Sequence, residues 1–489
     1  MRSIPCIRLG LILALTSFML LTLFTIYASV QLVHTILWSV LIPDTTIWFI
    51  SYIFRYNSFG GPALYVVHSN GVNVYTFNGD LIWRLNTSTT PIVQHIFTTD
   101  YKTDIIVCDG NIVSRRDSSN GQVVWQKVLG SQITALYSYE DVNNDGTWDV
   151  LVGDSNGNVY VLNGVNGNII WSKNLGASPV NGVSFLRISN TLGVVAYAGK
   201  GPSKVDVYLQ DGTLLWSKSI SSGISIVFWP RTYIATYFDL NADGYDEIAL
   251  ITDSAIMAFN GRTGDELWTK ALSVRPHTIW RVSEDLDGDG IYDLIVGTRQ
   301  GIYAVSSASG STVWYLNLNY IFFIDPYYQD IDKNGYSNAV VASDNLYIID
   351  LKQGNITWTF NEISPTAVQL TWITGSFNRN QVVVGSGNGD LVMIALEATS
   401  ETTTATTITR TITITETTTA TQSFYFTITN TVTFTQPATI TTTHLLSSEI
   451  TRTVMPTLTD QQVTLQTYLI AFAMIVSSTI IALLIRRGG

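Results

Sequence analysis

The chain has 489 residues, of which 46% are apolar and only 13% are charged, so it can bury a large core. Its 26 basic and 37 acidic residues give a net charge of −11, which excludes a nucleic-acid partner, because such binding begins with clustered positive charge. Two cysteines provide no disulfide framework, and five scattered histidines argue against a zinc or haem site.

The first predicted element is an apolar run from Leu9 to Val33, which follows two arginines. Small residues at Ala28 and Ser29 suit a cleavage site, so we assign residues 1–30 to a signal peptide or an N-terminal anchor. A buried helix is the alternative. We favour a cleaved signal, because a retained anchor would hold the following domain against the membrane.

Residues 31–398 carry an internal repeat marked by glycine and tryptophan. In each of seven units a glycine is followed four positions later by a tryptophan, at intervals of 42 to 52 residues. These tryptophans are Trp83, Trp125, Trp171, Trp216, Trp268, Trp314 and Trp358. β-Branched and aromatic runs separated by turn residues predict four strands in each unit. Four strands at this period are typical of the blades of a β-propeller.

The ends of the repeat array determine the number of blades. After the last tryptophan the chain supplies three strands, at 368–377, 381–385 and 390–395, but no fourth. The missing strand is predicted at Thr35–Ile42, where Trp38 lies 45 residues before Trp83. We therefore predict an all-β fold, an eight-bladed β-propeller closed by exchange of the N-terminal strand. His34 stands where the other units have glycine, so a seven-bladed ring is the alternative.

This repeat resembles that of quinoprotein-type propellers with PQQ-like repeats, and the resemblance covers about residues 34–397. It implies that the eight tryptophans, including Trp38, pack one blade against the next. The family contains quinone-dependent dehydrogenases and a non-catalytic outer-membrane assembly propeller. The resemblance to the dehydrogenases implies a quinone (PQQ) under a disulfide between adjacent cysteines, but Cys108 is the only cysteine of the repeat region. We therefore expect no PQQ cofactor, no catalytic residues and no enzymatic activity.

Three units carry an acidic loop between their first and second strands. Alternating oxygen side chains with a glycine after the third would surround one point with the hard oxygen ligands that Ca²⁺ prefers. The predicted ligands, the seventh of each loop through its carbonyl, are Asp141, Asn143, Asp145, Thr147 and Asp149; Asp239, Asn241, Asp243, Tyr245 and Glu247; and Asp285, Asp287, Asp289, Ile291 and Asp293. A weaker fourth set is Asp330, Asp332, Asn334 and Asn338.

These loops resemble the FG-GAP-like calcium loops of integrin α-subunits, so we predict structural Ca²⁺. The alternative is that they are Asx turns, whose side chains only satisfy backbone donors. Because each loop joins the first and second strands of a blade, all four should lie on one face of the ring.

The C-terminal part begins with a threonine-rich, low-complexity tract at residues 399–465, which we predict to be an O-glycosylated stalk. Alternating Thr and Ile at 411–415 could instead form a strand. Residues 466–489 contain an apolar run, Tyr468–Ile485, followed by two arginines, and we predict a transmembrane anchor with a short cytoplasmic tail. This organisation resembles that of archaeal stalked surface proteins.

These parts together predict a protein of the cell membrane with an extracellular head. We expect it to act in binding, adhesion or as a scaffold, with surface proteins, coat proteins or glycans as partners. The aromatic residues of Tyr315–Tyr328 could stack on sugars, although most of them should lie in core strands. A quinoprotein dehydrogenase and an extracellular sugar sensor are the alternatives.

Overall fold

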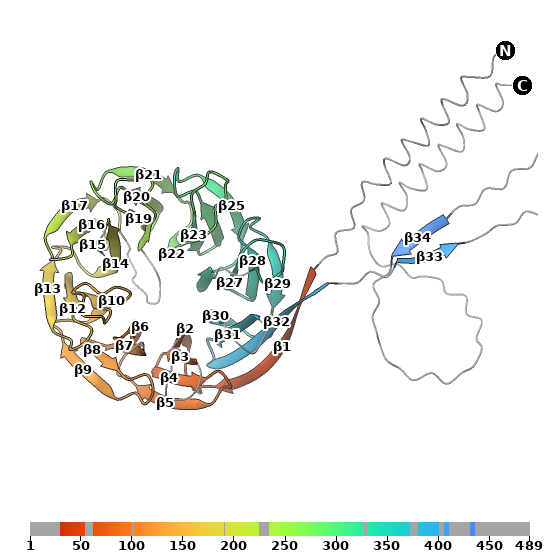
Figure 1. Ribbon diagram of the computed structural model, residues 1–489, viewed down its shortest axis with the longest axis horizontal. Helices are drawn as coiled ribbons and strands as arrows, with labels where there is room; N and C mark the ends of the chain where they lie inside the picture. Colours follow the sequence, from red (N-terminus) through yellow and green to blue (C-terminus); the bar gives the residue numbers. More distant parts are fainter. Residues whose placement is uncertain are drawn as a thin grey trace, which may run out of the picture. The chain divides into compact units, whose positions relative to one another are not determined.

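The structure is a computed structural model that describes residues 30–53, 62–99, 102–189, 191–223, 234–326, 330–371, 380–400, 405–409 and 431–435. Eight four-stranded antiparallel sheets surround a central axis as the blades of a ring (Figure 1). The predicted all-β, eight-bladed propeller is therefore confirmed, and the seven-bladed alternative is wrong.

The first seven blades each use four consecutive strands, with the first of the four nearest the axis. Blades 1 to 4 consist of β2 (Ile47–Ile53), β3 (Ala63–His68), β4 (Gly71–Thr76) and β5 (Leu81–Asn86); β6 (Ile92–Phe97), β7 (Thr103–Asp109), β8 (Ile112–Arg116) and β9 (Val123–Val128); β10 (Ile133–Tyr137), β11 (Val150–Asp154), β12 (Asn158–Leu162) and β13 (Ile169–Asn174); and β14 (Val180–Ile188), β15 (Thr191–Ala198), β16 (Ser203–Leu209) and β17 (Leu214–Ile220). Blades 5 to 7 consist of β18 (Ile234–Tyr237), β19 (Glu247–Ile251), β20 (Ala255–Phe259) and β21 (Glu266–Ala271); β22 (Pro276–Arg281), β23 (Leu294–Thr298), β24 (Gly301–Val305) and β25 (Thr312–Asn317); and β26 (Phe323–Pro326), β27 (Asn338–Ala342), β28 (Leu346–Asp350) and β29 (Ile356–Phe360).

Blade 8 joins the two ends of the ring. It contains β30 (Pro365–Thr371), β31 (Asn380–Ser386) and β32 (Asp390–Ser400), and its outer strand is β1 (Val30–Leu41). β1 pairs with β32 from Val30 opposite Ser400 to Leu41 opposite Asp390, with one bulge before Trp38. The predicted closure by the N-terminal strand is confirmed. The strand begins at Val30, so the last residues of the apolar run belong to it.

The core lies between neighbouring blades. The second strands are buried on both faces, as their continuous apolar runs predict, and the third strands are mostly buried. The fourth strands expose most of their residues and bury the tryptophan, as in β9 and β13. Tryptophans of the fourth strands lie at the blade junctions. Seven of them donate their indole N–H to a carbonyl in the next blade, with N···O distances of 2.7 to 3.0 Å; these are Trp38, Trp83, Trp125, Trp171, Trp216, Trp268 and Trp314.

Each of these rings also covers the repeat glycine of the next blade. A Cβ atom built at Gly167, for example, would lie 2.5 Å from Cε3 of Trp125. The eighth tryptophan, Trp358, faces His34 in place of that glycine, with ring centroids 5.5 Å apart in an edge contact. The junction between blades 7 and 8 therefore uses a different contact from the other seven, because an imidazole occupies the space that glycine leaves open elsewhere.

A second unit, residues 404–489, is separate from the ring. Its described residues form one antiparallel pair, β33 (Ala405–Thr409) and β34 (Thr431–Thr435), with Ala405 opposite Thr435. The alternating segment 411–415 and the predicted signal and anchor at 1–29 and 466–489 lie outside the described residues, as does most of the predicted stalk. Within the described ranges there is no helix long and apolar enough to cross a membrane.

Candidate functional site

The acidic loops lie on one face of the ring, together with the turns between third and fourth strands. In blade 3, Asn163 of such a turn donates its side-chain amide to Asp145 at 2.5 Å, and the Gly164 N–H donates to Asp149 at 2.9 Å. In blade 5, Asn260 bonds Asp243 in the same way at 3.3 Å. Blades of a closed ring repeat the same orientation, so the loops of blades 3, 5, 6 and 7 share this face.

The three strong loops have the same local conformation. The first carboxylate, Asp141, accepts hydrogen bonds from the backbone N–H groups of Asp145 and Gly146 at 3.1 and 2.7 Å. Asp239 accepts the equivalent bonds at 3.0 and 2.7 Å, and Asp285 accepts from the Gly288 and Gly290 N–H groups at 2.5 and 2.8 Å. These are the Asx turns of the alternative interpretation, and a cation can bind over the same turns because each carboxylate oxygen has a second lone pair.

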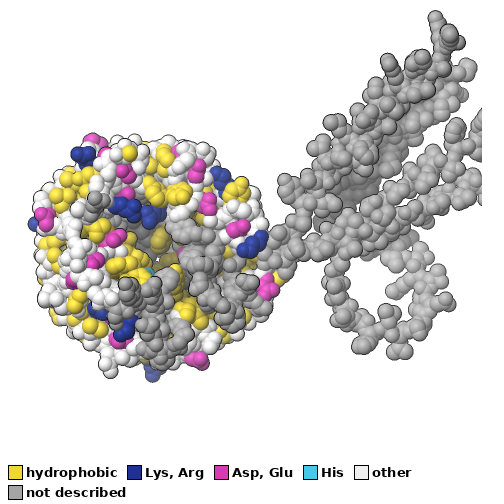
Figure 2. Space-filling view, in the orientation of Figure 1, with side chains coloured by type: hydrophobic (Ala, Val, Ile, Leu, Met, Phe, Trp, Pro, Cys, Tyr) yellow, Lys and Arg dark blue, Asp and Glu magenta, His cyan; other side chains and the backbone are white. Residues whose placement is uncertain are grey.

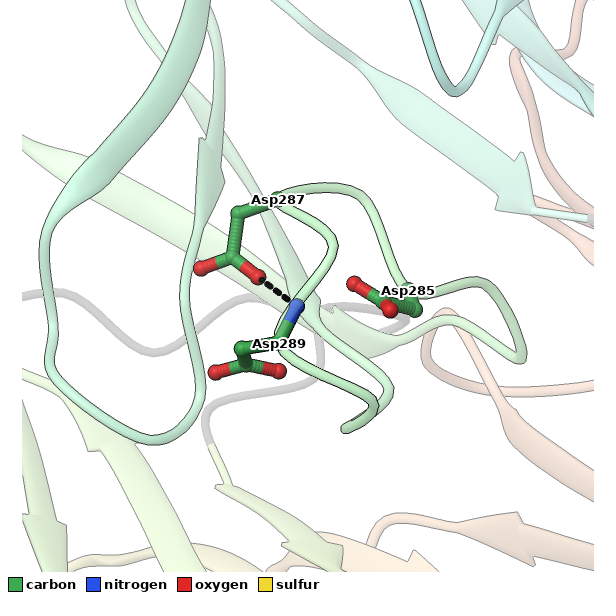
Figure 3. Close-up of side chains that lie close together, drawn as sticks. All are labelled: Asp285, Asp287 and Asp289. Atoms are coloured by element: carbon green, nitrogen blue, oxygen red, sulfur yellow. Dashed lines mark hydrogen bonds between the residues drawn. The ribbon is translucent and has the colours of Figure 1, made fainter.

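Blade 6 contains the tightest group of carboxylates, which Figure 3 shows. Ligand oxygens of Asp285, Asp287 and Asp289 all lie within 4.8 Å of one another, on a loop exposed to solvent. Lys352 of blade 7 donates to the backbone carbonyl of Asp285 at 2.6 Å. Three like charges at this spacing repel one another, and a cation that binds all three would remove the repulsion.

The ninth residue of a loop connects it to the rest of the blade. Asp149 accepts from the N–H groups of Val142 and Asn143 through one oxygen, at 2.8 and 3.2 Å, and from the Gly164 N–H through the other. Asp293 bonds Leu286 and Ser307 likewise, at 2.7 and 3.1 Å. Both carboxylates are fully buried, and this burial raises the pKa of each to about 6.

Glu247 takes the ninth position in blade 5 but differs from these two aspartates. It is also fully buried, yet among the described residues only the Leu240 N–H lies near its carboxylate oxygens, and neither oxygen makes a well-formed hydrogen bond. Burial, with the nearby charges of Asp243 and Asp239, raises the pKa of Glu247 to about 8. The seventh residues also vary: Thr147 is buried, whereas Tyr245 and Ile291 are partly exposed.

The fourth loop, in blade 7, uses amide groups as partners for its carboxylates. Asn334 donates its side-chain amide to Asp332 at 3.2 Å and also to Asp350. Asn338, at the ninth position, accepts from the Ile331 N–H at 2.6 Å and donates to Asp332 at 3.4 Å. These amides pair with the loop's carboxylates, and an amide replaces the carboxylate at the ninth position, so this loop is the weakest candidate.

The sequence analysis missed the contribution of the turns between third and fourth strands. Asn163, Asn260 and Asp350 each precede the repeat glycine by four residues and reach the acidic loop of their own blade. That constant spacing is visible in the sequence. An oxygen-bearing residue at this position would have identified the turn that contacts the acidic loop.

Hydrophobic side chains and charges of both signs lie at the edge of the ring's central hollow (Figure 2). The inner strands of blades 1, 6 and 7 bring together Phe49, Trp280 and Phe323, with centroids 5.8 and 6.2 Å from that of Phe323. Phe49 and Phe323 meet although blade 8 lies between their blades. In the aromatic stretch predicted from the sequence, Tyr315 and Phe322 are about two-fifths exposed, at 42% and 37%.

Cys108 has no feature of a reactive thiol in the described part of the ring. Its side chain is 2% exposed, and burial raises the pKa of the thiol, which disfavours the nucleophilic thiolate. His95 is similarly buried, and its pKa is lowered to about 4. Both residues belong to the packed interior.

The sequence matches, over residues 37–224 and 252–473, the family described as outer membrane protein assembly factor BamB. The chain belongs to the BamB family. Among solved structures, BamB from Moraxella catarrhalis aligns with 16% identity and a TM-score of 0.50, over 74% of this chain and 100% of the other. No curated protein matches the chain in sequence.

Other solved structures also align with this BamB-like ring. Sqt1 of Saccharomyces cerevisiae aligns with 11% identity and a TM-score of 0.58, over 74% of this chain and 98% of the other. The computationally designed protein Ika8 has 17% identity and a TM-score of 0.50, over 73% and 98%. Such identities show the fold alone. The family and the fold support a scaffold or binding role for the ring.

Proposed function

We propose that this BamB-like propeller is a non-catalytic binding or scaffold module, anchored at the cell surface and stabilised by Ca²⁺. The observation that carries the proposal is the position of the chain ends. Val30 and Ser400 are paired at the open end of β1 and β32, so both ends leave the ring at one point. In the other blades that point is occupied by the turn between third and fourth strands, which lies on the face of the acidic loops.

This arrangement supports anchoring through one face. The chain after Ser400 continues into the threonine-rich tract and the apolar run at 468–485. Fully extended at roughly 3 Å per residue, the 59 residues of 401–459 would span about 180 Å. A retained N-terminal anchor would shorten that reach to a few residues, because Val30 begins beside Ser400. We therefore favour a cleaved N-terminal segment, with the face opposite the acidic loops free to bind surface proteins or glycans.

The interior supports a non-catalytic role. Aromatic contacts between Phe49, Trp280 and Phe323 reduce the space near the axis where a quinone would bind, and the repeat region has no adjacent cysteines.

Cross-linking on intact cells that produce the protein, followed by mass spectrometry, tests the binding role. We expect cross-links from the turns on the free face, such as Lys200 between β15 and β16, to other surface proteins. Recovery of the protein with cross-links only to itself would contradict the scaffold role and favour a soluble ligand such as a sugar.

Chelation tests whether bound Ca²⁺ stabilises the folded protein. We expect EDTA to lower the melting temperature of the full chain in detergent, and Ca²⁺ to restore it, because a ligand that binds only the folded state stabilises it. A melting temperature that is the same at every Ca²⁺ concentration would refute calcium stabilisation.

A further inference from the structure

We propose that the loop Asp239–Glu247 in blade 5 is an obligate Ca²⁺ site that holds blade 4 to blade 5, while the equivalent loops of blades 3 and 6 keep their shape without the ion. This inference rests on the proposed calcium stabilisation and assigns different roles to sites that the sequence pattern makes equivalent.

The first step is the partner of the ninth carboxylate. Asp149 and Asp293 each have both oxygens bonded to backbone N–H groups, so their loops are closed by protein donors alone. Glu247 is as deeply buried, with a side chain one methylene longer, but the Leu240 N–H is the only backbone donor near its oxygens among the described residues. No described donor from the turn between the third and fourth strands takes the place of Gly164 or Ser307. A buried carboxylate with so few donors is costly unless a cation or a proton binds to it.

The second step identifies the occupant as a cation. Asp239 and Asp243 lie in the same loop, and their charges act directly on the Glu247 carboxylate. A proton on Glu247 would leave these two charges unneutralised, whereas a divalent cation could neutralise all three. The three carboxylates do not lie within 4.8 Å of one another as those of blade 6 do, so the ion would draw them together. Glu247 can supply both oxygens, and Ca²⁺ takes 6 to 8 oxygen ligands, whereas Mg²⁺ requires a small octahedral shell. Ca²⁺ is therefore the ion that this loop fits.

The third step is the contact with the neighbouring blade. Ser189, at the tip of the β14–β15 hairpin in blade 4, donates its N–H to the Gly244 carbonyl at 2.5 Å. The Asp246 N–H donates to the Arg187 carbonyl at 3.0 Å, and Ile188 forms an isolated β-bridge with Tyr245. The backbone of the ion-binding loop is thus one side of the junction between blades 4 and 5. Loss of the ion would therefore loosen both the loop and the junction between the two blades.

Hydrogen–deuterium exchange of the full chain in detergent, with Ca²⁺ or EDTA, tests this. We expect EDTA to speed exchange in peptides covering 187–189 and 239–247 by on the order of tenfold, with a much smaller change in 141–149 and 285–293. Glu247→Gln should abolish the Ca²⁺ response of the first two peptides. Glu266→Gln, the same change at an exposed site of the same blade, should keep it.

A second variant keeps the test valid if Glu247→Gln folds poorly. Glu247→Asp introduces the side chain found at this position in blades 3 and 6. In this variant we expect the junction peptides to exchange equally slowly in Ca²⁺ and in EDTA. Exchange that responds to Ca²⁺ equally in all four peptides, or a Glu247→Asp chain as Ca²⁺-dependent as the parent, would overturn the inference but not the proposed calcium stabilisation. If neither the exchange rates nor the melting temperature changes with Ca²⁺, the inference and the proposed calcium stabilisation are both refuted.

Discussion

Replacement of Gly167 by alanine tests how the blades are held together. Gly167 lies under the ring of Trp125, and an added Cβ would come within 2.5 Å of Cε3 and 2.8 Å of Cδ2. The ring cannot move aside freely, because its N–H donates to the Gly164 carbonyl at 2.8 Å. The substitution should therefore force blades 2 and 3 apart or break this hydrogen bond.

Gly176 provides a matched control for the backbone contribution. Its φ is +71°, against +72° at Gly167, but a Cβ there meets nothing within 4 Å. Alanine in this left-handed conformation costs about 1 kcal/mol net at either position. The close contact with a rigid ring adds about 1–3 kcal/mol, as overpacking does in cores. We therefore expect losses of about 1 kcal/mol for Gly176→Ala and about 2–4 kcal/mol for Gly167→Ala.

Equilibrium urea unfolding, followed by tryptophan fluorescence and circular dichroism, measures both losses. In a Trp125→Leu background the smaller side chain leaves room for the Cβ, so Gly167→Ala should then cost no more than Gly176→Ala. Equal losses for the two alanine variants in the parent chain would refute the docking argument, because only the tryptophan contact distinguishes them.

Two further predictions concern buried charges. Burial raises the pKa of Asp149 and Asp293 in the folded state from 3.8 to about 6, so these two groups bind more protons in the folded chain than in the unfolded chain between these values. In EDTA, stability should therefore fall as pH rises from about 4 to about 6, and Ca²⁺ should remove this slope; melting temperatures that rise over this range would contradict the assignment. Arg115→Ala should lower the free energy of unfolding in urea by about 3 kcal/mol, because it leaves the Asp104 carboxylate buried without its partner. In the parent chain this carboxylate is 7% exposed and lies 2.7 Å from the guanidinium. A loss below about 1 kcal/mol would contradict this.

The repeat itself could be predicted from the sequence because blades are built from local signals. Alternating turn residues and β-branched runs define strands, and the spacing from Gly167 to Trp171 recurs in seven of the eight units. Even the closure could be derived, since Trp38 completes the count that the three C-terminal strands leave open. Each of these inferences uses only the order of residues along the chain.

The acidic loops show where that kind of inference ends. Asp149, Asp293 and Glu247 occupy the same position of one spacing pattern, and the pattern predicts the same ligand role for all three. Their difference lies in which backbone N–H groups each carboxylate reaches, and those belong partly to a turn some 14 residues further along the chain, as with Gly164 and Ser307.

The length, apolar content and repeat spacing of the sequence thus determined the ring, its eight blades and its closing strand. Only the tertiary structure decided which tryptophan covers which glycine, that both chain ends leave on the face of the acidic loops, and that the Glu247 carboxylate is buried with fewer donors than Asp149 and Asp293. The physical reason is that these features depend on contacts between blades and between distant turns, which are set by strand register and packing and are not encoded in any local pattern.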